Sequence, residues 1–291
     1  MIINDVSIII VNYNTKQMTN ECIESIIAYT NGLNYEIILV DNGSSDGSKE
    51  FFEKKEGIVY IYSNENLGFG RANNLGAEKA TGNYLFLLNS DTLLFDNSIK
   101  KMLDFFTLNQ NVLKIGALGC ILIDDNKSMI NSGGFFPCSK NYIKSFFRIP
   151  VPIFSISLKE EYQLIDFVTG ADLMIDKDLF KKIGGFDENF FLYYEETDLQ
   201  KRIADLGYQN YLLTTTNIIH LEGGSDLGGK TSNFKRIVIH ESRNRYLSKH
   251  DKKYYKKYVI VDFFMNIARF IISDYTLKEK ITFFKANLKS Y

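Results

Sequence analysis

The sequence predicts an α/β fold with a mostly parallel, doubly wound central sheet flanked by helices. Two observations support this prediction. Apolar runs of strand length alternate four times with helical patterns over residues 6–88, and such alternation with short loops is typical of parallel sheets. The runs also lack the polar alternation of half-exposed strands, which indicates strands covered on both faces.

The first half of the chain supplies four strands, each followed by a polar tip. The strands are expected at residues 6–11, 35–40, 58–62 and 84–88, and the tips are residues 12–15, 41–48, 64–70 and 89–92. Ligands bind beyond the carboxyl ends of the strands in open α/β sheets. We therefore expect the tips to meet at one ligand-binding edge, although solvated loops are polar in any case.

The second half is less regular. A loop that covers or shapes a site is expected over residues 126–152, and a helix is expected to begin at Glu195 and to end near Gly207. The other expected elements are a helix over 97–110, strands over 115–123 and 167–175, a short helix over 177–183, and short strands over 208–213 and 218–220.

Composition indicates a folded, cytoplasmic protein. Of 291 residues, 45% are hydrophobic and 24% are charged, which is ordinary for a protein with a sizeable core. The net charge of −1 gives no indication of a nucleic-acid partner. No apolar run approaches the ~20 residues of a membrane span, and the start of the chain lacks the pattern of a secretory signal. Cys22, Cys120 and Cys138 are expected to be reduced thiols.

The composition changes from about His240. Residues 240–291 contain twelve Lys or Arg against five Asp or Glu, with Tyr and Phe placed between the basic residues. One interpretation is an amphipathic helical extension that contacts an anionic membrane surface. The other is a helical tail that packs its aromatic residues on the core. Both interpretations stay open.

Several residues at the strand tips suit a phosphate-bearing ligand. Asp91 follows a buried strand, where a carboxylate can hold a hard cation, although it could instead cap the helix expected near Asn97. Asp41 ends the second strand, where an acid can accept hydrogen bonds from a ribose or a base. Gly68 leaves room for a close backbone approach, and Arg71 offers a fork suited to phosphate.

Two further positions are candidates for chemistry. Glu195 and Glu196 form a carboxylate pair at a helix start, where the macrodipole favours the ionised form. Capping of the helix alone would explain one of them. His220 ends a short strand, and a lone histidine at such a place is more often structural than a ligand.

Seven motifs, taken in order, resemble the family-2 glycosyltransferases of the GT-A fold. The likeness is closest to the rhamnosyltransferase branch of bacterial surface-polysaccharide synthesis. The motifs are residues 6–14, 40–47, 66–74, 88–92, 184–188 and 194–199, followed by His220. The resemblance extends from Val6 to about Ser225. It implies a GT-A domain over residues 1–239, with a nucleotide-binding half to about residue 110 and an acceptor-binding, catalytic half over 111–239. Residues 240–291 would form a basic, aromatic helical extension.

The resemblance also implies roles for individual residues. Nucleotide-binding roles fall on Asp41, with Asn12 and Tyr13 near the base, and on Asn66, Gly68, Arg71 and Ser90. Asp91 and His220 would lie at a divalent cation, Mg²⁺ or Mn²⁺, that bridges the diphosphate. Glu196 would be the general base, with Glu195 as the alternative. Two residues depart from the family pattern, because Asn89 and Glu196 each stand where aspartate is commoner.

The expected activity is inverting, metal-dependent sugar transfer from a nucleotide-diphosphate donor, dTDP-rhamnose or a UDP-sugar. The acceptor would be a hydroxyl of a saccharide or a lipid-linked saccharide. One alternative is an inactive sugar- or lipid-binding homologue, because Asn89 reduces the number of metal-binding carboxylates. Another is a nucleotidyltransferase, which would need a basic, Gly-rich loop in place of Asn12–Thr15.

Overall fold

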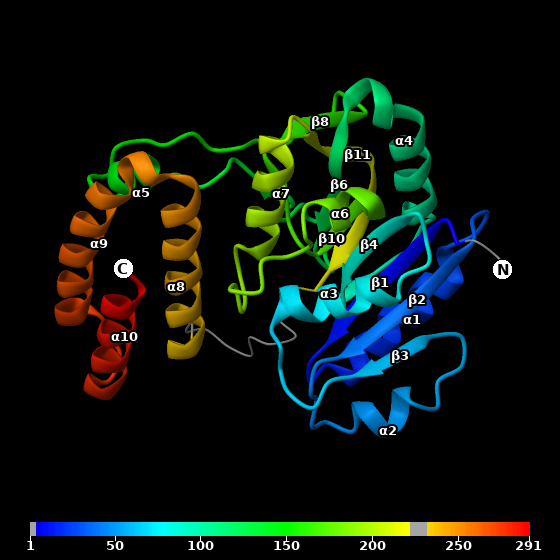
Figure 1. The fold of residues 1–291 in the computed structure, drawn as a ribbon, viewed down its shortest axis with the longest axis horizontal. Coiled ribbons are helices and arrows are strands. Elements are labelled where there is room, and N and C mark those ends of the chain that lie inside the picture. The colour runs from blue at the N-terminus through cyan, green and yellow to red at the C-terminus, as the bar shows by residue number, and fades with distance from the viewer. Residues whose placement is uncertain (1–3, 222–231) are drawn as a thin grey trace.

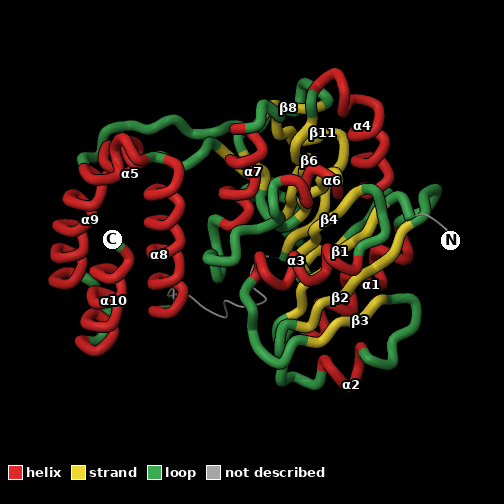
Figure 2. The backbone as a smooth tube through the Cα atoms, in the orientation of Figure 1, coloured by secondary structure: helices red, strands yellow, loops and turns green. Residues whose placement is uncertain are grey.

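The computed structural model describes residues 4–221 and 232–291. A central sheet with helices on both faces forms one part of the molecule, and three C-terminal helices stand beside it as a bundle (Figure 1). The strands gather in the first part, whereas the bundle is entirely helical (Figure 2). None of the helices within the described ranges is long and apolar enough to cross a membrane.

The first half of the chain forms the predicted parallel layer, in the strand order β3-β2-β1-β4. Its elements are β1 (Val6–Asn12), α1 (Lys16–Tyr29), β2 (Tyr35–Asp41), α2 (Ser48–Phe52), β3 (Val59–Tyr62), α3 (Phe69–Lys79) and β4 (Tyr84–Asn89). In register, Asn12 lies opposite Asp41, and Val11 lies opposite Asn89. The polar tips therefore meet at one edge, as the sequence predicted.

The second half makes the sheet mixed. Its elements are β5 (Thr92–Leu93), α4 (Ser98–Leu113), β6 (Ile115–Ile123), β8 (Tyr162–Ile165), β9 (Phe167–Val168), β10 (Asp172–Asp176), α6 (Lys177–Lys182), α7 (Glu195–Asp205) and β11 (Gln209–His220). β10 lies antiparallel between β4 and β6. The two short strands predicted over residues 208–220 are one strand, β11, whose pairing with β6 is interrupted between Leu213 and Asn217.

Two apolar cores lie on opposite faces of the sheet. On one face Ile23 of α1 and Met102 of α4 pack against β1 and β4. On the other face Ala72 of α3 and Ile203 of α7 pack against the same sheet, together with Phe180 of α6. These side chains are at most 3% exposed, and truncation of such a large aliphatic or aromatic side chain to alanine costs roughly 2–5 kcal/mol. The cores thereby hold α3 and α7 in fixed positions at the polar edge.

The prediction of a loop over residues 126–152 was wrong in part. This segment contains β7 (Gly133–Gly134) and a helix, α5 (Ser139–Phe146). α5 packs against a helix more than a hundred residues later, and its Tyr142 contacts the ring of Tyr258 there. The helix that packs against α5 is therefore too distant in the sequence to be inferred from the residues of this segment alone.

The bundle consists of α8 (Asn233–His250), α9 (Lys252–Ile272) and α10 (Leu277–Ser290). The domain boundary expected between residues 239 and 240 falls inside α8, since this helix begins at Asn233. Phe190, Tyr246, Leu247 and Tyr258 form a third apolar cluster. This cluster attaches the bundle to the segment that precedes α7. Cys22, Cys120 and Cys138 are free thiols, the first two buried.

Candidate functional site

A pocket of about 210 Å³ opens at the polar edge of the sheet. It is bordered by the tips of β1 and β4, the turn before α3 and the segment before α7. Its lining residues are Val11, Tyr13, Thr15, Asn42, Asn66, Gly68, Phe69, Asn89, Ser90, Asp91, Phe191 and Leu192. Of the nucleotide-binding and metal residues predicted from the sequence, Tyr13, Asn66, Gly68, Ser90 and Asp91 line this pocket.

Asn12 lies beneath the pocket and fixes its floor. The side chain is fully buried, and its oxygen accepts hydrogen bonds from the hydroxyls of Thr15 and Thr19 at 3.0 and 2.9 Å. Its amide donates to the hydroxyl of Ser44 at 3.1 Å. Tyr13, the next residue, is 47% exposed at the rim, so it is free to contact a flat ligand such as a base.

Asp41 is buried at the end of β2 and holds the adjacent loop. One carboxylate oxygen accepts a hydrogen bond from the Ser44 amide at 3.0 Å, and the other accepts one from the Tyr60 hydroxyl at 2.9 Å. Burial and the bond to Asp41 raise the pKa of Tyr60, so this phenol stays protonated and keeps donating. Asp41 thereby positions its neighbour Asn42, which lines the pocket.

The turn before α3 requires glycine at position 68. Asn42 accepts a hydrogen bond from the Leu67 amide at 2.8 Å, and Asn66 accepts one from the Gly68 amide at 2.9 Å. Gly68 has φ +83°, and a β-carbon on it would lie 2.1 Å from the carbonyl oxygen of Phe191. The next amide, that of Phe69, donates to this same carbonyl at 3.0 Å. The turn and the segment before α7 are therefore joined directly.

Arg71 points away from the pocket in this structure. Its Nε donates to the carbonyl of Glu188 at 2.9 Å and lies 3.8 Å from the Glu188 carboxylate. The predicted contact between Arg71 and phosphate therefore requires this interaction to open when the donor binds. The pair is half exposed, and such pairs contribute at most about 1 kcal/mol, so opening it is inexpensive.

Asp91 and His220 lie side by side. β5 pairs with β11 and sets His220 opposite Thr92, the residue after Asp91. The Asp91 Oδ1 and His220 Nε2 atoms are 3.2 Å apart, and both side chains are about 15% exposed. Asn89 reaches the same histidine nitrogen at 3.4 Å. Asp91 therefore does not cap α4, whose N-cap position is taken by Asn97.

The spacing of Asp91 and His220 fits two of the positions around a divalent cation. An octahedral cation with bonds of about 2.1 Å has adjacent ligand atoms about 3 Å apart, close to the 3.2 Å that separates Oδ1 and Nε2. Within residues 4–221 and 232–291, no group of three or more His, Cys, Asp or Glu side chains is placed to hold a metal. A diphosphate and water are further ligands that a cation at this pair would accept.

The two glutamates at the start of α7 lie beside the pocket and differ in access. Glu195 is 3% exposed, whereas Glu196 is half-buried. Gly170 lies between Glu196 and the pocket residue Phe69, because a β-carbon on this glycine would be 3.5 Å from Glu196 Cβ and 3.2 Å from the Phe69 ring. Glu195 instead packs beside Gly70 of α3, where a β-carbon would be 3.6 Å from Glu195 Cβ. Of the two acids, Glu196 is therefore the more accessible to solvent.

Burial decides the ionisation of these two acids. Burial first, and then the charge of Glu196, raise the pKa of Glu195 well above its usual range. Burial also raises the pKa of Glu196. The sequence suggested that the helix N-terminus would favour the ionised form, and this interpretation was wrong in direction because burial outweighs the dipole. A carboxylate with a raised pKa is a stronger base.

The backbone before α7 is held in an uncommon conformation. Tyr193 and Tyr194 both have φ of +68°, a region that non-glycine residues seldom occupy and that often accompanies function. The hydroxyl of Tyr194 shares a 2.7 Å hydrogen bond with that of Tyr142 in α5. This contact fixes the direction in which Glu195 and Glu196 leave the segment.

Asp198, one turn into α7, is a buried charge that the sequence indicated only as a possible helix cap within the 194–199 motif. It is fully buried and contacts Arg202 Nε at 2.8 Å, and Lys249 Nζ and His250 Nε2 at 2.7 Å each. Burial opposes ionisation, but hydrogen bonds from His250 and Lys249 lower its pKa. The spacing of Asp198 and Arg202 was visible in the sequence, whereas the contribution of α8 was not.

Asp172 is a second buried acid that sequence reasoning passed over. It begins β10 without exposure to solvent, and its Oδ2 accepts a hydrogen bond from the Cys120 amide at 2.6 Å. Its Oδ1 has no hydrogen-bond partner among the described residues. Burial raises its pKa to about 7.

Asp172 makes the stability of the fold pH-dependent. Its pKa is about 7 in the folded chain against an ordinary value of 3.8. Between about pH 4 and 7 the folded state therefore binds one proton more than the unfolded state. The free energy of unfolding should therefore fall by about 1.4 kcal/mol per pH unit as pH rises from about 4 to 7. Urea unfolding of wild type and Asp172→Asn at about pH 5 and pH 8 checks this. The stability of the variant relative to wild type should be greater at about pH 8 than at about pH 5, because most of the wild-type loss falls between these values. An equal difference at both would contradict the prediction.

The mixed α/β sheet, with the polar site at the carboxyl edge of its parallel strands, defines a GT-A glycosyltransferase fold. A sequence model of "Glycosyl transferase family 2" matches residues 7–184, more than half of the chain. The protein therefore belongs to glycosyltransferase family 2. This confirms the family and the fold that the sequence motifs predicted. The last part of the predicted resemblance, from Glu222 to Ser225, lies outside the described residues.

Similar proteins agree with this assignment. An uncharacterized glycosyltransferase of Rickettsia typhi is 32% identical over 195 residues, covering 67% of this chain and 57% of the relative. The N-acetylglucosaminyl-diphospho-decaprenol L-rhamnosyltransferase of Mycobacterium tuberculosis is 24% identical over 212 residues, covering 63% of this chain and 66% of the relative. The crystal structure of GalNAc-T7 with UDP, GalNAc and Mn²⁺ superposes with a TM-score of 0.64 at 15% identity, covering 87% of this chain and 50% of that one. The chain thus spans little more than half the length of two of these proteins.

Proposed function

We propose that the protein transfers a sugar from a nucleotide-diphosphate donor, dTDP-rhamnose or a UDP-sugar, to a hydroxyl of a saccharide acceptor. The transfer would invert the anomeric carbon and serve bacterial surface-polysaccharide synthesis. The observation that carries the proposal is Asp91, which lines the pocket and lies 3.2 Å from His220 behind it, with Glu196 at the start of α7 near the pocket residue Phe69. The rhamnosyltransferase relative supports the substrate class.

The donor nucleotide would bind in the pocket at the polar edge. Tyr13 would contact the base, while Asn42, Asn66 and Gly68 line the wall formed by the narrow turn before α3, beside which the phosphates would lie. Ser90, whose hydroxyl lies 3.1 Å from that of Thr15, adds a hydrogen-bonding group at the other wall. Asp41 contributes by holding Asn42 in place.

Asp91 and His220 would hold Mg²⁺ or Mn²⁺ at the diphosphate. When bound, the cation supplies positive charge that stabilises the departing diphosphate. GalNAc-T7 was crystallised with UDP and Mn²⁺, and it shares the fold. Because Asn89 carries no charge, Asp91 is the one carboxylate beside His220 among the described residues, so we expect the cation to bind together with the donor and weakly without it.

Glu196 would take the proton from the acceptor hydroxyl. Its raised pKa makes it a stronger base than a solvated carboxylate. The neighbouring Glu195 is enclosed, and burial together with the charge of Glu196 raises its pKa. Glu195 therefore stays protonated beside an ionised Glu196, which avoids two adjacent negative charges. A single base acting opposite the leaving group gives one displacement, and hence inversion.

A screen of nucleotide-sugars by thermal shift, followed by a donor-turnover assay, tests the proposal. A dTDP- or UDP-sugar with Mn²⁺ should raise the melting temperature, and chelation should remove the effect. Slow donor hydrolysis without an acceptor should follow. Binding without turnover would favour an inactive homologue, whereas release of pyrophosphate from a nucleoside triphosphate and a sugar phosphate would favour a nucleotidyltransferase.

An exposed apolar stripe on α9 supports a second part of the proposal, contact with an anionic membrane surface. Ile260, Phe264, Ile267 and Ile271 recur at helical spacing and are 36–72% exposed. The aromatic side chains behave differently, since Phe263 and Phe270 pack on Phe284 within the bundle. Lysines at the start of the same helix, Lys252, Lys253, Lys256 and Lys257, add positive charge. We expect the stripe to lie on the bilayer and the lysines to contact its headgroups.

Sedimentation with vesicles tests this part. The protein should sediment with phosphatidylglycerol vesicles and much less with phosphatidylcholine vesicles, because each well-placed basic residue contributes about 1 kcal/mol at an anionic surface. Salt should weaken the binding. Ile260→Ser with Ile271→Ser should abolish it, while Leu108→Ser, an equally exposed apolar residue on α4, should not. Equal binding to both vesicles, or to neither, would leave the bundle as a structural cap.

A further inference from the structure

A second pocket, of about 220 Å³, lies between α5, α8 and α9. It shares no lining residue with the pocket at the sheet edge. Its lining residues are Tyr142, Ser145, Phe146, Arg148, Arg243, Tyr258, Val261, Asp262, Met265 and Arg269. Three arginines thus face one carboxylate in a hollow that also has apolar walls and hydroxyl groups.

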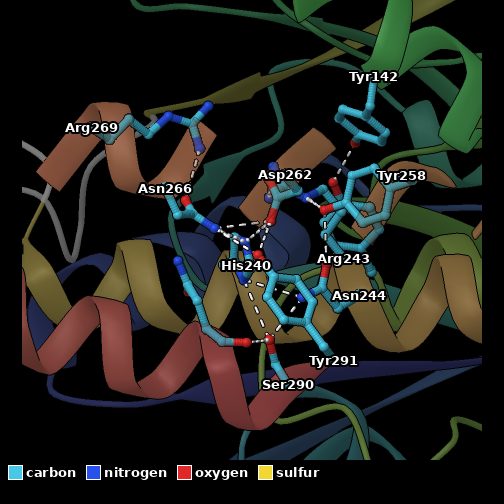
Figure 3. A network of polar contacts seen from close by, with 12 residues as sticks. Tyr142, His240, Arg243, Asn244, Tyr258, Asp262, Asn266, Arg269, Ser290 and Tyr291 are labelled. Atoms are coloured by element: carbon cyan, nitrogen blue, oxygen red, sulfur yellow. Dashed lines mark hydrogen bonds and ion pairs between the residues drawn. The ribbon is translucent and has the colours of Figure 1, made fainter. Parts of the chain in front are cut away.

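Arg243 is held in a fixed orientation. It is 14% exposed, its Nε donates to the Tyr258 hydroxyl at 2.8 Å, and its Nη2 donates to Asp262 Oδ1 at 3.2 Å. The guanidinium lies 5.2 Å from the centre of the Tyr142 ring. Tyr258 in turn donates to Asn244 at 2.8 Å. Figure 3 shows this network across the bundle.

Asp262 interacts with several polar groups inside the bundle. Its Oδ2 lies 2.6 Å from His240 Nε2 and accepts hydrogen bonds from the Tyr291 hydroxyl at 2.7 Å and from the Asn266 amide at 3.0 Å (Figure 3). Burial opposes ionisation, but these bonds and the nearby positive charge hold its pKa at about 2. Asp262 therefore balances one arginine, and the other two give the pocket an excess of positive charge.

The remaining arginines come from two different elements. Arg148 follows α5 and is exposed, whereas Arg269 in α9 is half-buried and donates a long hydrogen bond to Asn266 at 3.4 Å. Burial lowers the pKa of Arg269, and the charge of Asp262, which is shared with Arg243, only partly offsets this effect. Arginine forks match phosphate oxygens, and the hydroxyls of Ser145 and Tyr142 are further donors.

We propose that this pocket binds a phosphate-bearing group, namely the diphosphate through which a saccharide acceptor is attached to its lipid carrier. This assignment rests on the proposed function for the nature of the acceptor, and on the three arginines for the anion. The geometry joins the pocket to the reaction centre, because Tyr142 hydrogen-bonds Tyr194, the residue before Glu195. The apolar stripe belongs to the same helix, since Val261 and Met265 line the pocket while their chain neighbours Ile260 and Phe264 are exposed on another face of α9.

Calorimetric titration of the full chain with inorganic pyrophosphate, in EDTA, tests the anion site. EDTA disfavours the cation-dependent site at the sheet edge. Pyrophosphate should bind wild type and should bind Asp91→Asn equally well, because Asp91 lies in the other pocket. Arg148→Gln with Arg269→Gln should weaken binding at least tenfold. Arg245→Gln, an exposed arginine of α8 outside this pocket, is the matched control and should leave the affinity unchanged.

Two results would overturn the anion site. One is the absence of pyrophosphate binding to wild type, and the other is binding that the double variant retains in full. The single variant Arg148→Gln controls for misfolding of the double variant, because Arg148 is exposed and its replacement leaves the buried network intact. It should weaken binding severalfold while the melting temperature stays unchanged.

Two further titrants identify the source of the phosphate. Farnesyl diphosphate, a short soluble analogue of a lipid carrier, should bind more tightly than pyrophosphate, and Met265→Ser should remove this gain. Glycerophosphoglycerol, a phospholipid headgroup, should bind weakly. Equal or tighter binding of the headgroup would overturn the assignment to the acceptor. Because the readout is binding without donor, these results do not depend on whether the chain transfers sugar, and a failed transfer assay would not affect them.

Discussion

Replacement of Glu196 with glutamine should reduce sugar transfer by roughly 10²–10⁴-fold while nucleotide affinity stays nearly unchanged. Glutamine keeps the shape of the side chain and removes its basicity. The half-buried Glu196 lies near Phe69 of the donor pocket but does not line that pocket itself. Loss of the base should therefore lower turnover and spare donor binding.

The matched control is Glu195→Gln. Glu195 is enclosed, and burial together with the Glu196 charge keeps it protonated, so glutamine resembles the form already present. We expect a much smaller loss of activity. Nucleotide binding measured by calorimetry and transfer measured separately distinguish the two variants. An inactive Glu195→Gln beside a working Glu196→Gln would assign the base to Glu195 instead.

The same assignment predicts the pH profile of transfer. A base must be ionised to accept a proton, and burial raises the pKa of Glu196. The rate of the wild-type enzyme should therefore fall as pH drops through this raised pKa. In Glu196→Gln the residual rate should lose this acid limb, which a fold-stability effect would not produce.

Replacement of Asp91 with asparagine should lower activity about a hundredfold or more at limiting Mg²⁺ or Mn²⁺. Asp91 is the carboxylate that lies 3.2 Å from His220 in the donor pocket. Asparagine fills the same volume without the charge, so binding of the cation should weaken and its activation curve should shift to higher concentration. Steady-state rates over a range of cation concentrations give both quantities.

Two further variants sharpen this experiment. Asp104→Asn removes an exposed carboxylate of α4 that pairs with Lys100, and it should leave the cation dependence unchanged. Asn89→Asp adds a second carboxylate 3.4 Å from the same histidine nitrogen and should lower the cation concentration required. Full activity of Asp91→Asn at limiting cation would remove Asp91 from the proposed site.

The polar edge of the sheet was predictable from local sequence. The apolar runs of β1, β2 and β4 define buried strands, and parallel strands place their carboxyl ends together. The position of Asn12 opposite Asp41 follows from this rule alone. The approach of His220 to Asp91 did not follow from it, and was indicated only by the order of the family's motifs.

The parts that escaped prediction depend on partners distant in the chain. α5 is buried by α9, and Arg71 is engaged by Glu188, 117 residues later. Asp172 interrupts an apolar strand, and only the amide of Cys120 on the neighbouring strand explains how an acid is accommodated there. The periodicity of apolar residues within a helix or strand predicts which of its faces is buried. It does not predict which distant segment packs against that face.

The contacts of Asp198 tie the C-terminal helical bundle to α7, so the two cannot be separated or exchanged without an effect on stability. Lys249 and His250 are the last two residues of α8. Lys249 forms an ion pair with Asp198, and His250 lies within hydrogen-bond distance of the same carboxylate, in the helix that begins with the two catalytic candidates. A chain that ended before α8 would leave that carboxylate enclosed with Arg202 as its only counter-charge among those described, and stranding a buried charge costs several kcal/mol. An exchange of C-terminal segments between relatives would therefore have to transfer the partners of Asp198 as well. The matched family segment ends at residue 184, so both Asp198 and its partners in α8 lie beyond it.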